Sequence, residues 1–353
     1  MKILELTRSF YPSIGGMEKF VDDRLKIYEF LGHEYQVITT THSEKRLDNS
    51  KKLDFVKYLP SYTPYEIVPS LKQTMNLDYD VLSINQVGYF YSEYAINRAY
   101  QEGKKIILTP HFHFHTDRYK LFKDLHFKYI LPKSLYKVDK IICFTTHEAN
   151  YWIKNFPFTE QNIEIIPHYF QPPKSKVTEF KNEYEDFILF LGRGERNKRV
   201  DLLLPAFDEI KSNYKLVLTI AKDELSDVNK NIVDRNKNIH ILGRVSENEK
   251  QSLLATCKAL TLPTDYEAFG IVNLEASHYS KPLLLSNLKV FHNIFDSKGV
   301  MYFENNSKSL KRKLSDFIKL SLEEKHMMGR VNSVNLKQFS FEVISHKYSQ
   351  LLG

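Results

Sequence analysis

Cysteine and long apolar runs are scarce in this sequence, and both shortages narrow the class of protein. Only two cysteines occur in 353 residues, Cys143 and Cys257, far apart and in apolar surroundings. Because they show neither metal-ligand spacing nor a Cys-x-x-Cys pair, each is expected to be a reduced core thiol. No apolar run approaches the ~20 residues that span a bilayer. The first residues also lack the apolar stretch of about 7–15 residues found in a secretory signal, which predicts a cytoplasmic protein.

A strong charge imbalance is lacking as well. Lysine and arginine together number 50, against 43 aspartate and glutamate residues, and the net charge is +7. This mild surplus favours an anionic partner, either a phosphate-bearing substrate or an acidic membrane face, without deciding between them. No helix-turn-helix, zinc-finger or RNA-recognition pattern occurs, so nucleic acid is not an expected partner.

The remaining composition is that of an ordinary soluble globular protein. Hydrophobic residues make up 42% of the chain and charged residues 26%, which excludes a disordered chain, a collagen-like chain and a membrane bundle. At roughly 150 residues per domain, the length predicts two domains, each able to bury a core without disulfides.

Strand-like and helical segments alternate through the first 170 residues. A strand at 2–7, a loop with Gly15 and Gly16, a helix at 18–31 and a strand at 35–41 together have the size of a βαβ unit. Further strand-like runs lie at 80–84, 105–109, 140–144 and 163–166. This alternation predicts a parallel sheet covered on both faces.

A second series of strands and helices follows a charged, proline-containing stretch at 171–186, which we interpret as a linker. Its strands are predicted at 187–191, 215–220, 238–242, 259–262 and 282–285, and a last helix at 339–352. The expected fold class is therefore α/β, with two doubly wound Rossmann-like domains (1–170 and 187–335) facing a central cleft. In such sheets, ligands bind at the carboxyl ends of the strands, where the strand order reverses.

The most informative stretch is 265–276, with the sequence DYEAFGIVNLEA. Glu267 and Glu275 are separated by seven residues, and a helix is predicted at 271–278, directly after Gly270. The free N–H groups at a helix N-terminus bind phosphate or ligand hydroxyls, and a glycine lets the ligand approach the backbone. Glu275, further along the helix, can accept two hydrogen bonds from a cis-diol. Taken singly, either glutamate is equally well explained as a surface residue.

This string resembles the E-x7-E signature of the retaining glycosyltransferases of family 4, which have two Rossmann-like domains in the GT-B arrangement. Four further motifs resemble those of the family, in the same order, and extend the resemblance over nearly the whole chain. They are Gly15-Gly16-Met17-Glu18, Leu31-Gly32-His33-Glu34, the loop from Gly192-Arg193 to Lys198, and Leu242-Gly243-Arg244-Val245. The resemblance implies transfer of a sugar from a nucleotide-diphosphate sugar with retention of anomeric configuration.

The resemblance also implies a role for each matching residue. Glu267 and His111, which follows the strand at 105–109, are expected to be catalytic by contacting the donor sugar, and no protein nucleophile is required. Glu275 is expected to bind the ribose, and the cations of the loop after 187–191 to neutralise the leaving diphosphate. The expected donor-binding residues are Gly15, Gly16, Arg193, Lys198, Val245, Phe269, Gly270, Ile271, Val272 and Glu275.

Some of these assignments have alternatives. Arg196 and Arg199 lie in the same loop as Arg193 and Lys198, and the alternative is that this loop is a solvated basic segment without a role. The alternative for the double glycine is a plain tight turn. His111, His113 and His115 alternate, so an extended segment would point all three the same way, as in a three-histidine metal site. We expect no metal there, because no carboxylate cluster accompanies them and the family's chemistry typically needs none.

The chain departs from the family's pattern in three places. Ala268 stands where glycine is frequent, Pro167-His168-Tyr169 where Pro-Asn-Gly is, and Lys198-Arg199 where Lys-Gly is. These departures affect fine donor contacts and leave the core string intact. Family architecture further implies that the N-terminal domain binds the acceptor, that the C-terminal domain binds the nucleotide sugar, and that the final helical segment, 336–353, crosses back onto the N-terminal domain.

The segment 116–140 combines basic and aromatic residues, with seven lysines and arginines against three aspartates. Such a segment can rest on an anionic membrane face and meet a lipid-linked acceptor. The alternative is a solvated helix whose aromatic side chains pack into the N-terminal core together with Leu121, Leu125, Ile130 and Leu131.

The expected protein is therefore a hexosyltransferase that takes a UDP- or GDP-sugar and a glycan or lipid-linked acceptor, in the synthesis of cell-surface polysaccharide or glycoconjugate. It is expected to need no metal or other cofactor, and to lie in the cytoplasm or peripherally at the inner membrane face. Two alternatives stay open: a nucleotide-sugar epimerase or phosphorylase of the same architecture, and an inactive partner subunit of a transferase. Sugar, acceptor and linkage depend on loop side chains that vary within one fold.

Overall fold

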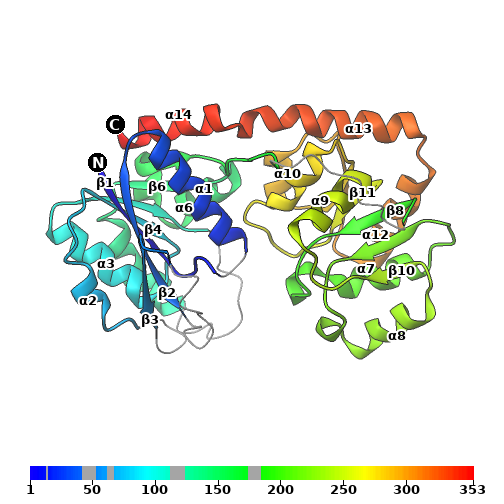
Figure 1. Cartoon of the computed structure of the whole chain (residues 1–353), viewed down its shortest axis with the longest axis horizontal. Coiled ribbons are helices and arrows are strands. Elements are labelled where there is room, and N and C mark those ends of the chain that lie inside the picture. Colours follow the sequence, from blue (N-terminus) through cyan, green and yellow to red (C-terminus); the bar gives the residue numbers. More distant parts are fainter. Residues whose placement is uncertain (13–14, 42–52, 62–66, 112–123, 174–183) are drawn as a thin grey trace. The chain divides into compact units, whose positions relative to one another are not determined.

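The computed structural model describes the chain except for residues 13–14, 42–52, 62–66, 112–123 and 174–183. The chain divides into two compact units: the first comprises Met1–Tyr169 together with Phe341–Gly353, and the second Phe170–Ser340 (Figure 1). The chain thus leaves the first unit after Tyr169 and returns to it at Phe341. Most of the stretch interpreted as a linker, 171–186, lies outside the described residues.

The first unit is built on a seven-stranded parallel sheet in the order β3-β2-β1-β4-β5-β6-β7. The strands are β1 (Lys2–Thr7), β2 (Glu34–Thr41), β3 (Val56–Pro60), β4 (Val81–Asn85), β5 (Lys105–Thr109), β6 (Lys140–Cys143) and β7 (Ile163–Ile165). The helices are α1 (Gly16–Phe30), α2 (Leu71–Thr74), α3 (Phe90–Gln101), η3 (His126–Ile130), α5 (Leu131–Leu135), α6 (Thr146–Asn155), η4 (Pro157–Asn162) and α14 (Phe341–Leu352). The strand order reverses between β1 and β4, so their carboxyl ends mark the place where such sheets bind ligands.

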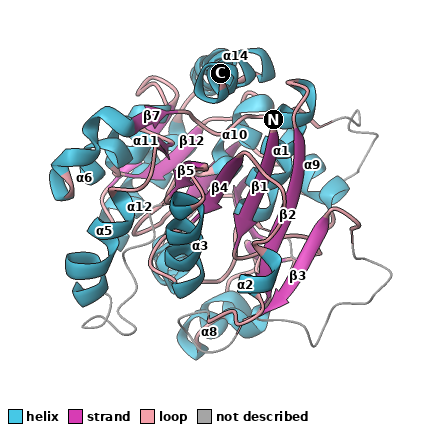
Figure 2. Cartoon of the chain, turned by 90° about the vertical axis from the view of Figure 1, so that its left-hand side faces the viewer, coloured by secondary structure: helices cyan, strands magenta, loops and turns pink. Residues whose placement is uncertain are grey.

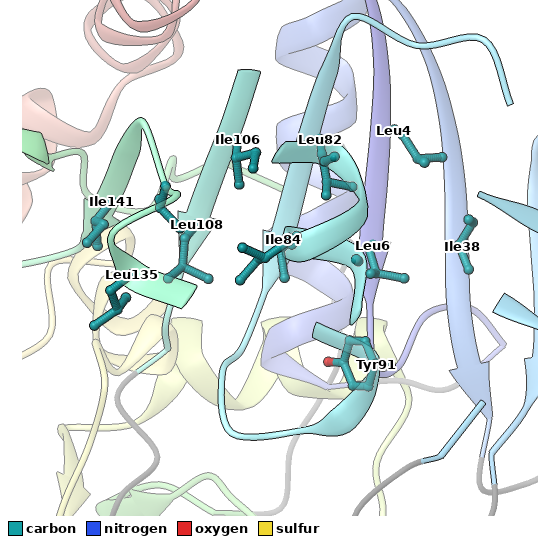
Figure 3. Packing of buried hydrophobic residues seen from close by; sticks show 14 of the residues in the cluster. Leu4, Leu6, Ile38, Leu82, Ile84, Tyr91, Ile106, Leu108, Leu135 and Ile141 are labelled. Carbon is teal, nitrogen blue, oxygen red and sulfur yellow. The ribbon is translucent and has the colours of Figure 1, made fainter. Parts of the chain in front are cut away.

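One face of this sheet is lined with leucine and isoleucine. Successive side chains of a strand point to opposite faces, so every second residue of the central strands contributes to it. Figure 2 shows α3 on one side of the sheet and α1 on the other. The cluster on the α3 side includes Leu4, Leu6, Ile38, Leu82, Ile84, Ile106, Leu108 and Ile141, together with Tyr91 and Leu135 (Figure 3).

The last helix, α14, packs within the first unit, where it contacts α1. The ring of Phe341 lies 4.9 Å from that of Phe30 and 5.2 Å from that of Tyr169, between centroids. The Lys105 ammonium group donates a hydrogen bond to the Leu351 carbonyl oxygen at 2.9 Å, near the end of the helix. Segments from both ends of the chain therefore build this unit.

The second unit is a six-stranded parallel sheet in the order β10-β9-β8-β11-β12-β13. The strands are β8 (Phe187–Phe190), β9 (Lys215–Leu218), β10 (Ile239–Ile241), β11 (Ala259–Leu262), β12 (Leu283–Ser286) and β13 (Val300–Phe303). The helices are η5 (Arg196–Lys198), α7 (Val200–Asp208), η6 (Lys222–Glu224), α8 (Asp227–Arg235), α9 (Glu247–Thr256), α10 (Ile271–His278), α11 (Lys289–Ile294), α12 (Ser307–Lys319), α13 (Leu322–Asn335) and η7 (Leu336–Phe339). Here the order reverses between β8 and β11.

The predicted alternation of strands and helices is confirmed in both units, but two strands are missing from the prediction. Both β3 and β13 lie at the edge of a sheet. Each is short. β3 ends in Pro60, and because proline cannot donate a ladder hydrogen bond, it is tolerated mainly in edge strands. Length alone does not explain why they are missing, since the edge strands β7 and β10 are shorter and are predicted; β3 buries only Val56 and Leu59, and β13 only Val300 and Phe303.

The segment 116–140 is described from residue 124 onward, and it is not a regular α-helix. Residues His126–Ile130 form a π-helical turn before α5 begins at Leu131. The wider turn shifts side chains off the α-helical face, so Leu131 is buried whereas Leu125 and Ile130 are exposed. The expectation that Leu125 and Ile130 share the core is therefore wrong.

Cys143 and Cys257 are buried free thiols, as predicted, and burial raises the pKa of Cys257 to about 12. Among the helices of the described residues, none is both long and apolar enough to cross a bilayer.

Candidate active site

In the first unit, the predicted site residues lie at the carboxyl ends of β1 and β5. Gly15 is extended and occupies the N-cap position of α1, and Gly16 begins the helix. A glycine has no side-chain oxygen with which to cap the first amide groups, so these can face a ligand. Ser9, on the loop after β1, donates a hydrogen bond to Glu18 Oε1 at 2.5 Å and so ties the loop to the first turn of α1.

His111 follows β5 and is only 4% exposed. Its φ of +57° lies in the left-handed region that residues with a side chain rarely adopt. Its Nε2 lies 3.0 Å from Oδ1 of Asn85, the last residue of β4. Its ring meets those of Phe20 and Phe144 edge-on, at centroid distances of 4.9 and 5.1 Å. A strained backbone that holds a fixed ring is typical of functional sites.

Gln86, directly after β4, is a candidate that sequence reasoning missed. Like His111 it is buried and left-handed, with a φ of +69°, and its amide N–H donates to the Thr109 carbonyl oxygen at 2.9 Å. Its side-chain Oε1 is buried without a hydrogen-bond partner among the described residues. Strained residues thus follow two neighbouring strands. The only signal in the sequence is a polar residue directly after a strand.

A buried ion pair connects α1 to these strand ends. Arg24 of α1 pairs with Glu5 of β1, and both side chains are at most 1% exposed. The Arg24 guanidinium also donates to Thr109 Oγ1 at 2.9 Å and to Asn85 Oδ1 at 2.7 Å. Burial disfavours the charge on Arg24, but the Glu5 carboxylate outweighs this effect, and the pKa of Arg24 is raised. Its guanidinium therefore stays charged inside the unit.

His168, where the family often has asparagine, is also buried near His111. Its ring lies 4.8 Å from that of Phe20 and 4.1 Å from that of Phe144. Burial, reinforced by the positive charge of Arg24, lowers the pKa of His168 to about 3. The imidazole is therefore neutral at ordinary pH.

In the second unit, α10 spans the predicted residues, Ile271–His278, and Gly270 is its N-cap. Gly270 has a φ of +83°, and a Cβ there would lie 2.7 Å from Nδ2 of Asn273 and 3.0 Å from Cε1 of Phe291. Only glycine fits such a position. Both amide atoms of Asn273 are buried without a hydrogen-bond partner in the described part of the chain. The helix start is thus closely packed, with Ile271 and Val272 half-buried in its first turn.

The two glutamates of the motif have different cationic partners. Glu267 forms an ion pair with Lys198, a contact that the sequence analysis did not predict. Glu275 pairs instead with Lys250 of α9 at 2.9 Å, and Lys250 also pairs with Glu247 at 2.9 Å. Burial disfavours the charge of Lys250, but the two carboxylates outweigh it and raise its pKa. No motif in the sequence marks Lys250.

The other cations of the loop after β8 are placed differently. The Arg193 side chain is 62% exposed and lies 3.4 Å from the Glu195 carboxylate. Arg199 is held by two carboxylates, Asp265 at 2.8 Å and Asp201 at 3.0 Å. Arg199 thus has a structural explanation, whereas Arg193, Arg196 and Lys198 remain candidates for a phosphate.

Val245 and Phe269 complete the predicted set. Val245 is half-buried in the loop between β10 and α9, directly before Ser246, whose side chain caps α9. Phe269 is buried, with its ring 5.6 Å from that of Phe339 between centroids. The predicted donor residues other than Gly15 and Gly16 therefore all belong to the second unit.

The three-histidine alternative falls largely outside the described residues, because His113 and His115 lie in 112–123. Among the residues that the structure describes, no three His, Cys, Asp or Glu side chains are grouped so as to hold a metal ion.

Two family profiles match the chain, and they divide it where the two units divide. The profile described as Glycosyltransferase Family 4 matches residues 14–170, and that described as Glycosyl transferases group 1 matches residues 173–332.

Similar proteins cover nearly the whole chain. An uncharacterized glycosyltransferase of Methanocaldococcus jannaschii is 25% identical over 97% of this chain and 95% of its own length. The GDP-mannose:cellobiosyl-diphosphopolyprenol alpha-mannosyltransferase of Komagataeibacter xylinus is 21% identical over 99% and 92%. Among solved structures, Anabaena HepE in complex with UDP and glucose superimposes with a TM-score of 0.79 at 14% identity, covering 100% and 99%. The structural likeness confirms the predicted α/β class with two Rossmann-like domains of the GT-B type.

Proposed function

Since the chain belongs to the glycosyltransferases of family 4 and group 1, we propose that it transfers a hexosyl group from a nucleotide-diphosphate sugar to a hydroxyl of a glycan or lipid-linked acceptor. The transfer retains the anomeric configuration and serves the synthesis of cell-surface polysaccharide or glycoconjugate. The observation that carries the proposal is the Lys198–Glu267 ion pair next to the glycine-capped start of α10.

The donor binds in the second unit through Lys198 and Glu267, which form an ion pair with each other. A diphosphate brings about two negative charges, which attract Lys198 away from Glu267. Glu267 can then accept hydrogen bonds from the sugar hydroxyls, while the first amides of α10, at Ile271 and Val272, face the phosphate or sugar. Glu275, oriented by Lys250, accepts the two ribose hydroxyls. Arg193, on its exposed loop, adds a second cation for the diphosphate.

The reaction needs no nucleophile from the protein. The acceptor oxygen bonds to the anomeric carbon from the side on which the phosphate oxygen leaves, and the hydroxyl proton passes to that leaving oxygen. Charge builds on the diphosphate as the bond breaks, and Lys198 and Arg193 stabilise it. His111 and Glu267 hold the sugar. Anomeric analysis of the product by NMR tests retention, and an inverted product contradicts it.

Two donors deserve priority. The Komagataeibacter relative is named for GDP-mannose, and Anabaena HepE binds UDP and glucose. Titration calorimetry of the full chain with GDP-mannose and UDP-glucose, with EDTA present, identifies the base and tests our proposal that no metal is required. Silence with both nucleotides, with and without Mg²⁺, would overturn the donor assignment and favour an inactive partner subunit.

The role of Glu275 is tested by Glu275→Ala, with Glu323→Ala, an exposed carboxylate in the first turn of α13, as the matched control. Losing two charge-assisted hydrogen bonds should weaken donor binding by about 10–100-fold, whereas the control should bind as the wild type does. Equal donor affinity in wild type and Glu275→Ala would sink this role.

His111 is tested in the same way by His111→Ala, with the exposed His346→Ala on α14 as its control. His111→Ala should lower kcat more than it weakens donor binding, because its contact near the anomeric carbon matters most as the bond breaks. Donor consumed without acceptor, by epimerisation or phosphorolysis, would instead favour the epimerase or phosphorylase alternative.

We also propose that the first unit rests on an anionic membrane, where a polyprenol-linked acceptor would be found. The support is an exposed surface on η3 and α5, here called the η3–α5 surface. It comprises Leu125, Lys128, Tyr129, Ile130, Lys133 and Tyr136. Tyr129 and Tyr136 are 55% and 69% exposed, and apolar or aromatic groups beside lysines suit the boundary between head groups and acyl chains. The proposed location is therefore peripheral, at the cytoplasmic face of the membrane.

Sedimentation with vesicles tests this contact. The full chain should pellet with phosphatidylglycerol vesicles at low salt and less with phosphatidylcholine vesicles, and Tyr129→Ser/Ile130→Ser should reduce pelleting. The matched control is Leu322→Ser/Met327→Ser, which removes equally exposed apolar groups from α13 of the second unit. Protein that stays in the supernatant with anionic vesicles refutes the membrane contact without touching the donor assignment.

A further inference from the structure

A chain of four buried side chains leads from the interior of the first unit to His111. Glu5 pairs with Arg24, Arg24 donates to Asn85 Oδ1 at 2.7 Å, and Asn85 Oδ1 lies 3.0 Å from His111 Nε2. Asn85 Nδ2 donates in turn to Glu5 Oε1 and to the Leu6 carbonyl oxygen. Glu5, Arg24, Asn85 and His111 are all less than 5% exposed.

The chemistry of these groups permits only one orientation of the Asn85 amide. A guanidinium has donors and no acceptor, and a carboxylate or carbonyl oxygen only accepts. Turning the amide over would set Nδ2 against the donors of Arg24, and Oδ1 against the oxygens of Glu5 and Leu6. The ion pair therefore holds Oδ1 toward His111. Because Oδ1 can only accept, the hydrogen between it and His111 must sit on Nε2.

We propose that Glu5, Arg24 and Asn85 are positioning residues that keep a hydrogen on Nε2 of His111, which in a neutral ring selects the Nε2–H tautomer. In that tautomer Nδ1 is the acceptor of the ring, so a substrate hydroxyl that meets Nδ1 must donate its proton. The expected hydrogen bond from a substrate hydroxyl to Nδ1 rests on the proposed function. The tautomer itself does not.

Two further observations favour a positioning role over a stabilising one. A buried ion pair is a poor source of stability, since apolar side chains of similar volume often do as well or better. The pair is nevertheless fixed by a further contact, the hydrogen bond from Arg24 to Thr109 Oγ1 at 2.9 Å. The strained φ of +57° at His111 likewise shows that its surroundings dictate its conformation.

The tautomer is read directly from the ¹⁵N shifts and two-bond couplings of the imidazole in the uniformly labelled full chain. A spectrum at pH 8, where an imidazole is ordinarily neutral, gives the ratio of the two forms, and His111→Gln identifies the His111 signals. We expect the Nε2–H form in the wild type. The Nδ1–H form, or an even mixture, would overturn the proposal without any further variant.

Asn85→Leu removes the acceptor and should produce a mixture of tautomers. Ser83→Ala is the matched control: Ser83 is buried two residues earlier on the same face of β4 and binds Tyr28, not His111. It should leave the Nε2–H form intact. An Asn85→Leu protein that keeps the wild-type tautomer would contradict the role of Asn85.

Kinetics separate positioning from a general structural role. Asn85→Leu should lower kcat by about 10–100-fold, by analogy with metal-bound histidines that lose the partner that orients them. Its donor Kd should change far less. In a His111→Ala background the same substitution should have little further effect on kcat, because both changes remove one unit. If the kcat losses of the two single variants multiplied in the double variant, Asn85 would act independently of His111. Failure of donor binding in the wild type would refute the proposed function and leave the tautomer result standing.

Discussion

The two faces of the sheet in the first unit are made by the same strands and both bury apolar side chains, but only one of them also buries an ion pair. In β1, Leu4 and Leu6 point to the α3 side, whereas Glu5 between them points to the α1 side. In β4, Ile84 belongs to the apolar cluster and the next residue, Asn85, to the ion-pair network. Alternation in a strand thus separates two kinds of interior by one residue.

This difference assigns the faces different tasks. The leucine and isoleucine face removes apolar area from water, which stabilises the fold without specifying any chemistry. The opposite face buries a charged pair, a setting in which the loss of hydration tends to cancel the gain from pairing. What it supplies is a fixed arrangement of donors and acceptors behind His111.

The substitution Arg24→Met is the strongest test of this division of tasks between the two faces. It leaves the Glu5 carboxylate buried without its cation and should lower the free energy of unfolding by about 3–5 kcal/mol, measured by urea denaturation. Adding Glu5→Leu should recover most of that loss, because an apolar pair can replace an ionic one. The double variant should then be stable, yet its kcat should be lowered by about 10–100-fold, as in Asn85→Leu. A double variant as unstable as the single one would speak against this assignment of tasks.

The neighbouring substitution Ile84→Ala tests the other face. Removing a buried methylene and two methyl groups should lower the free energy of unfolding by about 3 kcal/mol. At a temperature where the protein stays folded, donor affinity and the His111 tautomer should be those of the wild type. If Ile84→Ala changed the tautomer as Asn85→Leu does, the two faces would not be separable.

The pH dependence of stability gives a smaller effect for each pH unit, carried by His168. Its pKa falls from an ordinary 6.5 to about 3 in the folded chain, so between these values the unfolded state binds the proton that the folded state refuses. Stability should therefore fall as the pH drops from 6.5 toward 3, with a slope from this residue of up to about 1.4 kcal/mol per pH unit. His168→Asn cannot titrate and should flatten the curve by that amount. An unchanged slope, measured by urea denaturation at several pH values, would contradict the shift.

The smallest effect concerns backbone strain at the polar face. Gln86→Gly should raise the free energy of unfolding by about 0.5–1 kcal/mol, since the left-handed conformation costs a residue with a side chain roughly 1–2 kcal/mol and the flexibility of glycine offsets part of the gain. Gln86→Ala keeps the strain and serves as the control. Thermal unfolding should rank Gly above Ala. The reverse ranking would show that Gln86 is not strained.

The sequence predicts much of this fold and about half of the candidate site. Glu267, Gly270 and Glu275 stand close together in one motif, and a strand–turn–helix pattern is enough to place them. Contacts between residues that are far apart in the chain produce no comparable pattern in the sequence. Glu5 interrupts an otherwise apolar strand only once, and its partners Arg24 and Asn85 lie 19 and 80 residues away.

Lys250 and Gln86 were missed for related reasons. Lys250 is one charged residue on a polar-looking helix, and only the packing of α9 against α10 brings it to Glu275. Gln86 differs from other residues after strands in its left-handed φ. Only a glycine would have indicated such an angle in the sequence. The π-helical turn at His126–Ile130 likewise follows no simple apolar period, so the sequence predicts a basic, aromatic surface in 116–140 but not which of its apolar side chains are exposed.

The return of the chain at Phe341 has a consequence for synthesis. The last helix carries Tyr348, which is buried and interacts with Arg24, with its ring 6.2 Å from that of Tyr28. A ribosome therefore makes the whole of Phe170–Ser340 before it makes the helix that covers the ion pair. The second unit can fold while the nascent first unit is still open, so the polar face behind His111 is closed only after Phe341–Leu352 has been made.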